Sequence, residues 1–301
     1  MKHTLFFALG LLCLGCPNGS TGSDGGESDG DIEPTDIEID VSGTARVHPA
    51  AVDFLNTNGR AVPSIEGLTL RVEEPLKVAL HDPLGEFGTV ILDGGGAFRV
   101  NAVPVQLVNL GIAAGIRDET DAGVCGADAG VPDGGCKTVY RVVRSATVLY
   151  DVALEQKKPE TDITGAVAFA IPTDFHEQLT AAVTPATILQ ITGANQKSTL
   201  LEAGFMLGRI VDAQGNPVAN AKVAPSPAAL ASQFFYPTSD LSGTQGSTSA
   251  NGLFVFVHTG GDVNTFRFTI EGKSEYRQRN AGAAKDACLV VTVYPGTTPP
   301  P

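Results

Sequence analysis

The stretch GRIVDAQGNPVANAKV, residues 208 to 223, decides the fold of the second half of this 301-residue chain. Apolar residues alternate with other residues before Asp212 and after Pro217, and the residues between them favour a turn. This pattern predicts a strand, a turn and a second strand. Residues 247 to 257, STSANGLFVFV, add a turn and a further apolar strand, so the segment reads as antiparallel sheet.

The two stretches together resemble the carboxypeptidase regulatory-like family, whose members have a transthyretin-type β-sandwich. The matching residues are Gly208, Asp212, Gly215, Pro217, Val218, Ala221 and Val223 in the first stretch and Thr248, Gly252 and Phe254 in the second. The resemblance implies a sandwich domain over residues 203–295 with Phe254 in its core. It also implies a structural or binding role, because such modules stand beside catalytic or adhesive domains and contact other proteins or envelope polymers.

The first half repeats the same pattern more loosely, and we expect it to form another sandwich domain over residues 37–195. Apolar alternation occurs in short segments at 37–41, 67–72, 96–100, 137–143, 148–154 and 165–171. The residues that match the family pattern loosely are Gly43, Gly59, Pro63, Leu68, Leu70, Gly96 and Phe98. The predicted fold class is therefore all-β, with two immunoglobulin-like or transthyretin-like antiparallel sandwich domains and a disordered proline-rich tail at 296–301.

Two local signals interrupt the strands. Asn58-Gly59 predicts a tight hairpin turn, because this pair accepts positive φ. Residues 174–183 predict one short helix, with Thr173 or Asp174 as its N-cap and Pro185 beyond its end. The apolar residues expected on one face of that helix are Phe175, Leu179 and Ala182.

The amino-terminal segment has the features of an export signal. Lys2 precedes an apolar run from residue 5 to residue 14, which is too short to cross a bilayer, since that takes about 20 residues. Leu14-Gly15-Cys16 resembles the bacterial lipobox, although Cys13 stands where that motif usually has Leu. We expect residues 1–15 to be a lipoprotein signal peptide and Cys16 to carry the lipid, with palmitate-type acyl chains anchoring the protein. The alternative is an ordinary signal peptide in which Cys16 is incidental.

Residues 16–36 predict a disordered linker rich in Gly, Ser and Asp, because they cannot bury enough apolar surface to fold. Eight acidic residues fall between positions 24 and 40, and removing them from the net charge of −13 leaves −5. A nucleic-acid backbone would be repelled by this charge, so we expect no nucleic-acid partner. Pro17 follows the lipobox cysteine, which favours the outer membrane as the location.

Three further cysteines lie in the body of the chain. Cys125 and Cys136 stand at the ends of a Gly- and Asp-rich loop within an insertion at 118–136, and in an oxidising compartment we expect them to form a disulfide. Closing a loop of this size contributes about 2.8 kcal/mol on the chain-entropy model. Acidic residues in the insertion lack the close spacing of a calcium loop, so a solvated loop is favoured. Cys288 lies in an apolar run and is expected to be buried.

No catalytic, cofactor or metal site emerges from the sequence. His176-Glu177 begins like a zinc-protease motif, but Thr180 replaces the second histidine. Phe234, Phe235 and Tyr236 form an aromatic cluster, either a core plug or a contact patch for a partner. We therefore expect a non-catalytic, lipid-anchored cell-envelope protein with a structural, adhesive or protein-interaction role and an envelope protein or polymer as its partner. The alternative is a ligand- or glycan-binding accessory protein of a transporter or hydrolase system.

Overall fold

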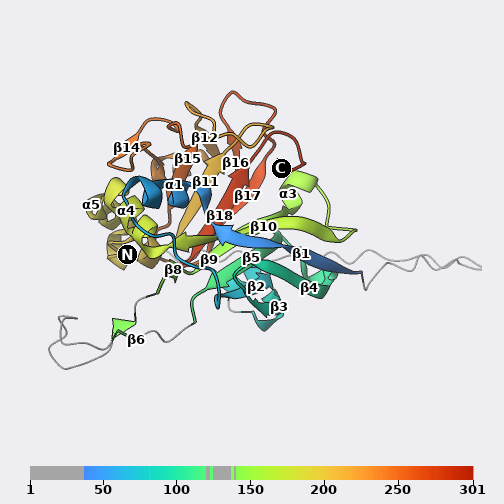
Figure 1. Cartoon of the computed structure of the whole chain (residues 1–301). Coiled ribbons are helices and arrows are strands. Elements are labelled where there is room, and N and C mark those ends of the chain that lie inside the picture. Colours follow the sequence, from blue (N-terminus) through green and yellow to red (C-terminus); the bar gives the residue numbers. More distant parts are fainter. Residues whose placement is uncertain (1–36, 81, 120–122, 125–136, 139, 301) are drawn as a thin grey trace, which may run out of the picture. The chain divides into compact units, whose positions relative to one another are not determined.

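Two facing sheets enclose an apolar core in the first half of the chain (Figure 1). The computed structural model describes residues 37–80, 82–119, 123–124, 137–138 and 140–300. One sheet holds β4 (Ala97–Pro104), β1 (Glu38–Val47), β10 (Ile163–Pro172) and β8 (Val142–Val143), and the facing strands are β9 (Ser145–Asp151), β5 (Gly111–Arg117), β2 (Thr69–Glu73) and β3 (Glu86–Ile91). Alternate residues of β1 and β2, such as Val41 and Leu70, fill this core, which confirms a sandwich-like arrangement.

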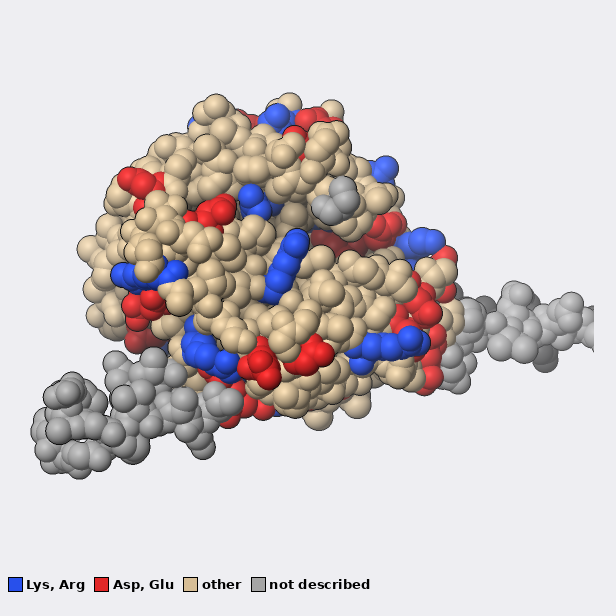
Figure 2. Space-filling model, in the orientation of Figure 1, with Lys and Arg blue, Asp and Glu red and all other residues tan. Residues whose placement is uncertain are grey.

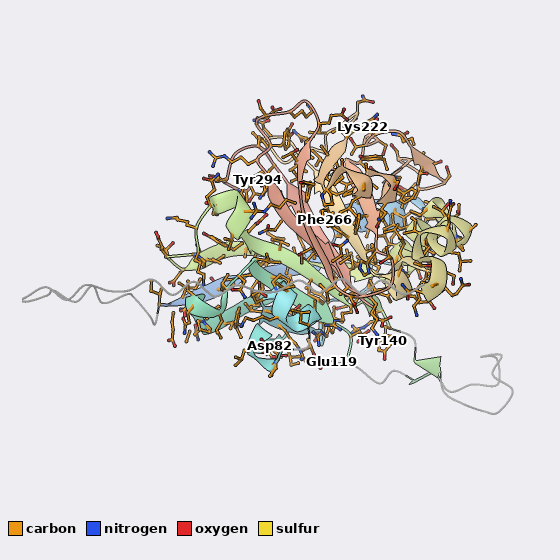
Figure 3. The ribbon with its side chains drawn as sticks, turned by 180° about the vertical axis from the view of Figure 1, so that it is seen from behind. Asp82, Glu119, Tyr140, Lys222, Phe266 and Tyr294 are labelled. Carbon is orange, nitrogen blue, oxygen red and sulfur yellow. The ribbon has the colours of Figure 1, made fainter. Side chains whose placement is uncertain are left out.

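The second half has a core of its own. A three-stranded sheet of β12 (Val223–Ser226), β16 (Asn264–Ile270) and β17 (Arg279–Ala283) packs against β14 (Thr244–Gln245), β13 (Phe234–Pro237), β15 (Leu253–Val257), β11 (Phe205–Ile210) and β18 (Cys288–Val293). Phenylalanine rings dominate the space between these sheets, with the Phe256 and Phe266 ring centroids 4.6 Å apart. Phe266 lies among these strands in Figure 3. The second core is therefore also sandwich-like.

One sheet of nine strands runs through both halves. Strand β18 pairs in parallel with β11 on one side and with β9 on the other, so the order is β14-β13-β15-β11-β18-β9-β5-β2-β3. Strands β1 and β10 are also parallel. The prediction of wholly antiparallel sheets is therefore wrong at these three strand pairs. Parallel strands need long connections between them, and each of these pairs is joined by a long stretch of chain. Strands from both sides of the predicted boundary at 195–203 share this sheet, and residues Asp36–Pro301 form one compact unit.

Helices cover one part of the large sheet. Helices α1 (Pro49–Thr57), α4 (Thr173–Val183), α5 (Pro185–Thr192) and α6 (Leu200–Ala203) gather on one side of Figure 1, and their apolar residues share a core with β11 and β15. The predicted helix at 174–183 is confirmed as α4, with Phe175, Leu179 and Ala182 buried. Its N-cap is Pro172, and neither predicted residue caps it.

The sequence predicted one helix only, and this is wrong, since α1, α5 and the short helices α2 (Pro75–Ala79) and α3 (Val152–Glu155) are also present. The predicted hairpin at Asn58-Gly59 is instead the end of α1. The Asn58 backbone N–H donates to the carbonyl of Phe54 at 3.1 Å, and Gly59 has φ of 63°. The same positive φ that suits a hairpin also suits a helix C-terminus.

Two short segments complete the described chain. Strands β6 (Gly123–Val124) and β7 (Lys137–Thr138), which precede and follow residues 125–136 in the sequence, pair antiparallel. Residues 296–300, which were predicted to be a disordered tail, follow β18, and the backbone N–H of Gly296 donates to the carbonyl of Glu275 at 2.9 Å.

The residues of the decisive motif have clear structural tasks. Gly208 and Phe254 are direct partners across β11 and β15, and the ring of Phe254 occupies the space that a side chain at Gly208 would need. One Asp212 carboxylate oxygen accepts from the backbone N–H of Gln214 at 2.9 Å and of Asn216 at 2.8 Å, which fixes the turn. Hydrogen bonding from Asn216 also lowers the pKa of Asp212. The turn predicted from Asp212 to Pro217 is confirmed.

Candidate functional site

A cavity of about 610 Å³ is lined by residues from both halves of the chain. Strands β5 and β9 contribute one wall, and β17 with residues 260–263 and 284–287 contributes the other. Most of the lining is apolar or small and includes Leu76, Val148, Ala281, Ala283 and Leu289. Sites for small ligands have volumes of about 300–1,000 Å³ and this kind of lining. The cavity therefore has the size and character of a ligand site.

Helix α2 forms part of the wall because buried hydrogen bonds hold its first turn in place. The Glu74 carboxylate accepts from the backbone N–H of Lys77 at 2.8 Å and of Leu110 at 2.9 Å, which ties the helix to the start of β5. Pro75 occupies the first helical position, where its missing N–H has no cost. No residue of this helix is fully buried, and Leu80 beyond it is 61% exposed. The helix thus presents apolar side chains that are only half covered.

Two buried carboxyl groups line the same cavity. Burial raises the pKa of Glu73, whose carboxylate lies 3.4 Å from the guanidinium of Arg117. Burial also raises the pKa of Asp151, whose carboxylate accepts from the backbone N–H of Ala153 at 2.9 Å and of Asn280 at 3.0 Å. A carboxylate has about four acceptor positions, so each can still accept a hydrogen bond from a ligand amine or hydroxyl.

The histidines of the described chain are core residues. His176 accepts from the backbone N–H of Leu201 at 3.1 Å, and burial lowers its pKa to about 4. The ring is 6% exposed, so His176 is part of the core and not a solvated residue of the helix surface. Burial lowers the pKa of His48 to about 3. No group of three or more His, Cys, Asp or Glu side chains in the described ranges could hold a metal ion.

The site residues predicted from the sequence fall into two groups. Cys16, Cys125 and Cys136 lie outside the described residues. Phe234 and Tyr236 belong to β13 and are buried in the second core, while Phe235 packs half-buried against the helices. An exposed contact patch at these aromatics is therefore wrong for Phe234 and Tyr236, because successive strand residues point into two different cores. Cys288 is buried as expected, and burial raises its pKa.

Sequence reasoning did not find the cavity. Glu73 is the last residue of β2 and lies on the same strand face as Arg71, and Asp151 is the last residue of β9. The residues next to them in the sequence do not indicate that either carboxyl group is buried. The residues that line the cavity range from Glu73 to Leu289, and some of the segments that contribute them are more than 100 residues apart in the chain. The one available signal was the Glu73-Glu74-Pro75 run after a strand, which is typical of a helix start.

Comparisons with known proteins add little. In the part of the chain that the structure describes, no helix is long and apolar enough to span a bilayer. No family model matches the sequence, and no curated protein matches it.

The solved structures that are similar include a streptococcal ancillary pilin, with 12% identity, a TM-score of 0.21, and coverage of 87% of this chain and 70% of that one. The shaft pilin SpaA of Lactobacillus rhamnosus GG has 10% identity and a TM-score of 0.22, with 88% and 100% of the two chains covered. The minor pilin GBS52 of Streptococcus agalactiae has 10% identity and a TM-score of 0.21, with 87% and 98% covered. Likeness at this level supports no statement about the activity of this chain.

Proposed function

We propose that this protein is a non-catalytic, lipid-anchored binding protein of the cell envelope, built of two immunoglobulin-like or transthyretin-like sandwich units that share one sheet. The cavity of about 610 Å³ carries this proposal. Its apolar lining, with Glu73 and Asp151 as polar groups, suits a ligand with an apolar body and an amine or hydroxyl group. Burial lowers the pKa values of His48 and His176, which makes both rings poor proton acceptors near neutral pH and supports a non-catalytic role.

Anchoring at Cys16 is the first testable part. We expect the native protein to enter the detergent phase and to carry the added mass of two or three acyl chains, since more than one chain is needed for stable anchoring. The Cys16→Ala variant is expected to stay in the aqueous phase, and Cys13→Ala is the matched control that should behave like the native protein. Detergent partitioning with intact mass measures this. An aqueous native protein with an unmodified terminus would exclude the anchor.

The cavity can be tested by filling it. Ala146 of β9 lines the cavity and is half-buried, so Ala146→Phe should occupy the space of a ligand. We expect the native protein to bind the uncharged fluorescent probe N-phenyl-1-naphthylamine at one saturable site, and Ala146→Phe to weaken binding about ten-fold or more. Ala224→Phe makes the same change on β12, which does not line the cavity, and should bind normally. Equal binding by all three proteins would contradict the proposal.

A scaffold or adhesion role is the second candidate. The segment from the end of α2 to the end of β3, the edge strand of the large sheet, exposes three large apolar side chains, Leu80, Leu84 and Ile91. Exposed apolar groups of this kind favour a protein partner. If the cavity binds nothing in the filling experiment, this edge becomes the better supported binding surface.

A further inference from the structure

A second hollow, of about 250 Å³, is lined by three arginines. Arg46 is the second-last residue of β1, Arg209 lies in β11 and Arg279 begins β17, so three sheets supply one cation each. His48 and Tyr294 line the same hollow. Figure 2 shows a furrow in one face of the molecule with both basic and acidic side chains along it, and Figure 3 shows Tyr294 beside the red strands. A local concentration of positive charge is unusual in a chain of net charge −13.

In the described part of the chain, the three guanidinium groups have no acidic partner within salt-bridge distance, although the charge of Asp53 acts on Arg209 and that of Asp151 on Arg279. Among the described residues, no carboxylate forms a salt bridge with Arg46, Arg209 or Arg279, although five other arginines form one each or more. Arg209 donates to the carbonyl of Asn251 at 3.3 Å. Asp151 also lines the hollow, where its two oxygens accept backbone N–H groups of Ala153 and Asn280, and its negative charge can offset one of the three positive charges. The positive charge of this hollow is therefore only partly compensated.

Two of the polar groups here are deeply buried and incompletely bonded. Arg279 is 3% exposed, and although its guanidinium stacks 4.2 Å from the Tyr294 ring centroid, its Nε has no hydrogen-bond partner. His48 is 1% exposed and its Nδ1 also has no partner. A buried polar atom without a partner costs about 1–3 kcal/mol, so each of these two atoms would gain from a ligand oxygen that accepts a hydrogen bond.

The start of α1 adds to the positive potential. His48 is the N-cap of this nine-residue helix, its side chain makes no capping bond, and the first turn contains no acidic residue. A helix N-terminus carries roughly half a positive charge and favours anions. Burial is the largest cause of the lowered pKa of His48, and the positive charges of Arg209 and Arg46 lower it further. Both guanidinium groups therefore act electrostatically on this ring.

We propose that this hollow binds a phosphate monoester, a doubly charged oxyanion on a small organic group. Guanidinium groups match phosphate oxygens in paired hydrogen bonds, and three of them can neutralise two negative charges. A volume of about 250 Å³ admits the phosphate and a group of a few carbons, and Tyr294 offers a flat apolar contact for the latter. The hollow shares Val148 and Asp151 with the cavity of the proposed function, but its three arginines do not line that cavity, so this proposal does not depend on it.

Isothermal titration of the folded protein at constant ionic strength tests the site, with inorganic phosphate and glycerol 3-phosphate as probes. We expect one saturable site that binds glycerol 3-phosphate more tightly, because the organic group adds contacts. Arg46→Gln and Arg209→Gln should each weaken binding about ten-fold or more. Arg267→Gln, on an exposed part of β16, is the matched control and should stay within about two-fold of the native protein.

Several outcomes would overturn the assignment. Equal weakening by Arg267→Gln would mean that net charge alone attracts the probe. Succinate binding as tightly as glycerol 3-phosphate would exclude a phosphate site, and so would the absence of saturable heat. Arg46 is exposed and Arg209 half-buried, so both variants are expected to keep the native circular dichroism spectrum, and either one suffices for the test.

Discussion

Lowering the pH from about 7 to about 4.5 is expected to destabilise the folded protein by several kcal/mol, because two buried histidines resist protonation. Burial lowers the pKa of His176 to about 4 and that of His48 to about 3, from an ordinary value of 6.5. The unfolded chain takes up these protons near pH 6.5 and the folded chain does not. Stability is therefore fully present above pH 6.5 and is lost as the pH falls toward the folded pKa values. Each histidine contributes on the order of 3 kcal/mol.

The structural cause differs at the two rings. His176 must stay neutral to accept the N–H of Leu201, which begins the contact between α4 and α6. His48 lies between the rings of Phe169, at 5.1 Å, and Phe175, at 6.3 Å, where water cannot solvate a charge. Glu73 and Asp151 act in the opposite direction, since burial raises their pKa values and folding then favours their protonated forms.

Urea unfolding across this pH range measures the effect, and His176→Gln isolates it. Glutamine keeps an acceptor for the Leu201 N–H but does not titrate, so the variant should lose less stability than the native protein between about pH 6.5 and 4.5. Subtracting the two curves removes the carboxyl contributions, which both proteins share. At about pH 8 both proteins have neutral side chains at position 176, so any difference there reports packing alone. Parallel curves over the whole range would refute the assignment.

The sequence allowed us to predict the strands that have one buried face and one exposed face. Strands β1 and β4 alternate because one face is buried and the other is not. Strand β5, with the sequence GIAAGIR, is buried on both faces and shows no alternation, so it was missed. Helix α1 was missed because its apolar face is narrow and its C-terminal Asn58-Gly59 also suits a hairpin.

The pairing of strands and the two hollows could not be predicted for a related reason. Strand β18 has two parallel neighbours, β11 and β9, and no local residue pattern identifies a partner far away in the sequence. The three arginines of the second hollow are at positions 46, 209 and 279 and become neighbours only when these strands assemble. Single residues such as Phe254 and Cys288 were predictable as core residues because their immediate neighbours are apolar.

Replacing Gly208 with alanine is expected to destabilise the protein by about 3 kcal/mol, at the upper end for an overpacked core. A Cβ at this position would overlap three atoms of the Phe254 ring, which lies directly across the ladder between β11 and β15. The ring cannot move aside easily, because the rings of Phe234 and Phe268 lie 6.0 and 5.8 Å from it. Thermal or urea unfolding measures the loss, and Gly243→Ala, where a Cβ meets open space, is the control.

A double-mutant cycle separates this collision from a general effect of alanine in a strand. Phe254→Leu alone removes buried aromatic volume and should be destabilising, but in the Gly208→Ala background the smaller side chain leaves room for the new Cβ. The two losses should therefore sum to more than the loss in the double variant, with a coupling of about 1 kcal/mol or more. Additive losses would mean that Gly208 is needed for its backbone alone. A positive coupling would show that the glycine and the phenylalanine of the decisive motif are one packing unit.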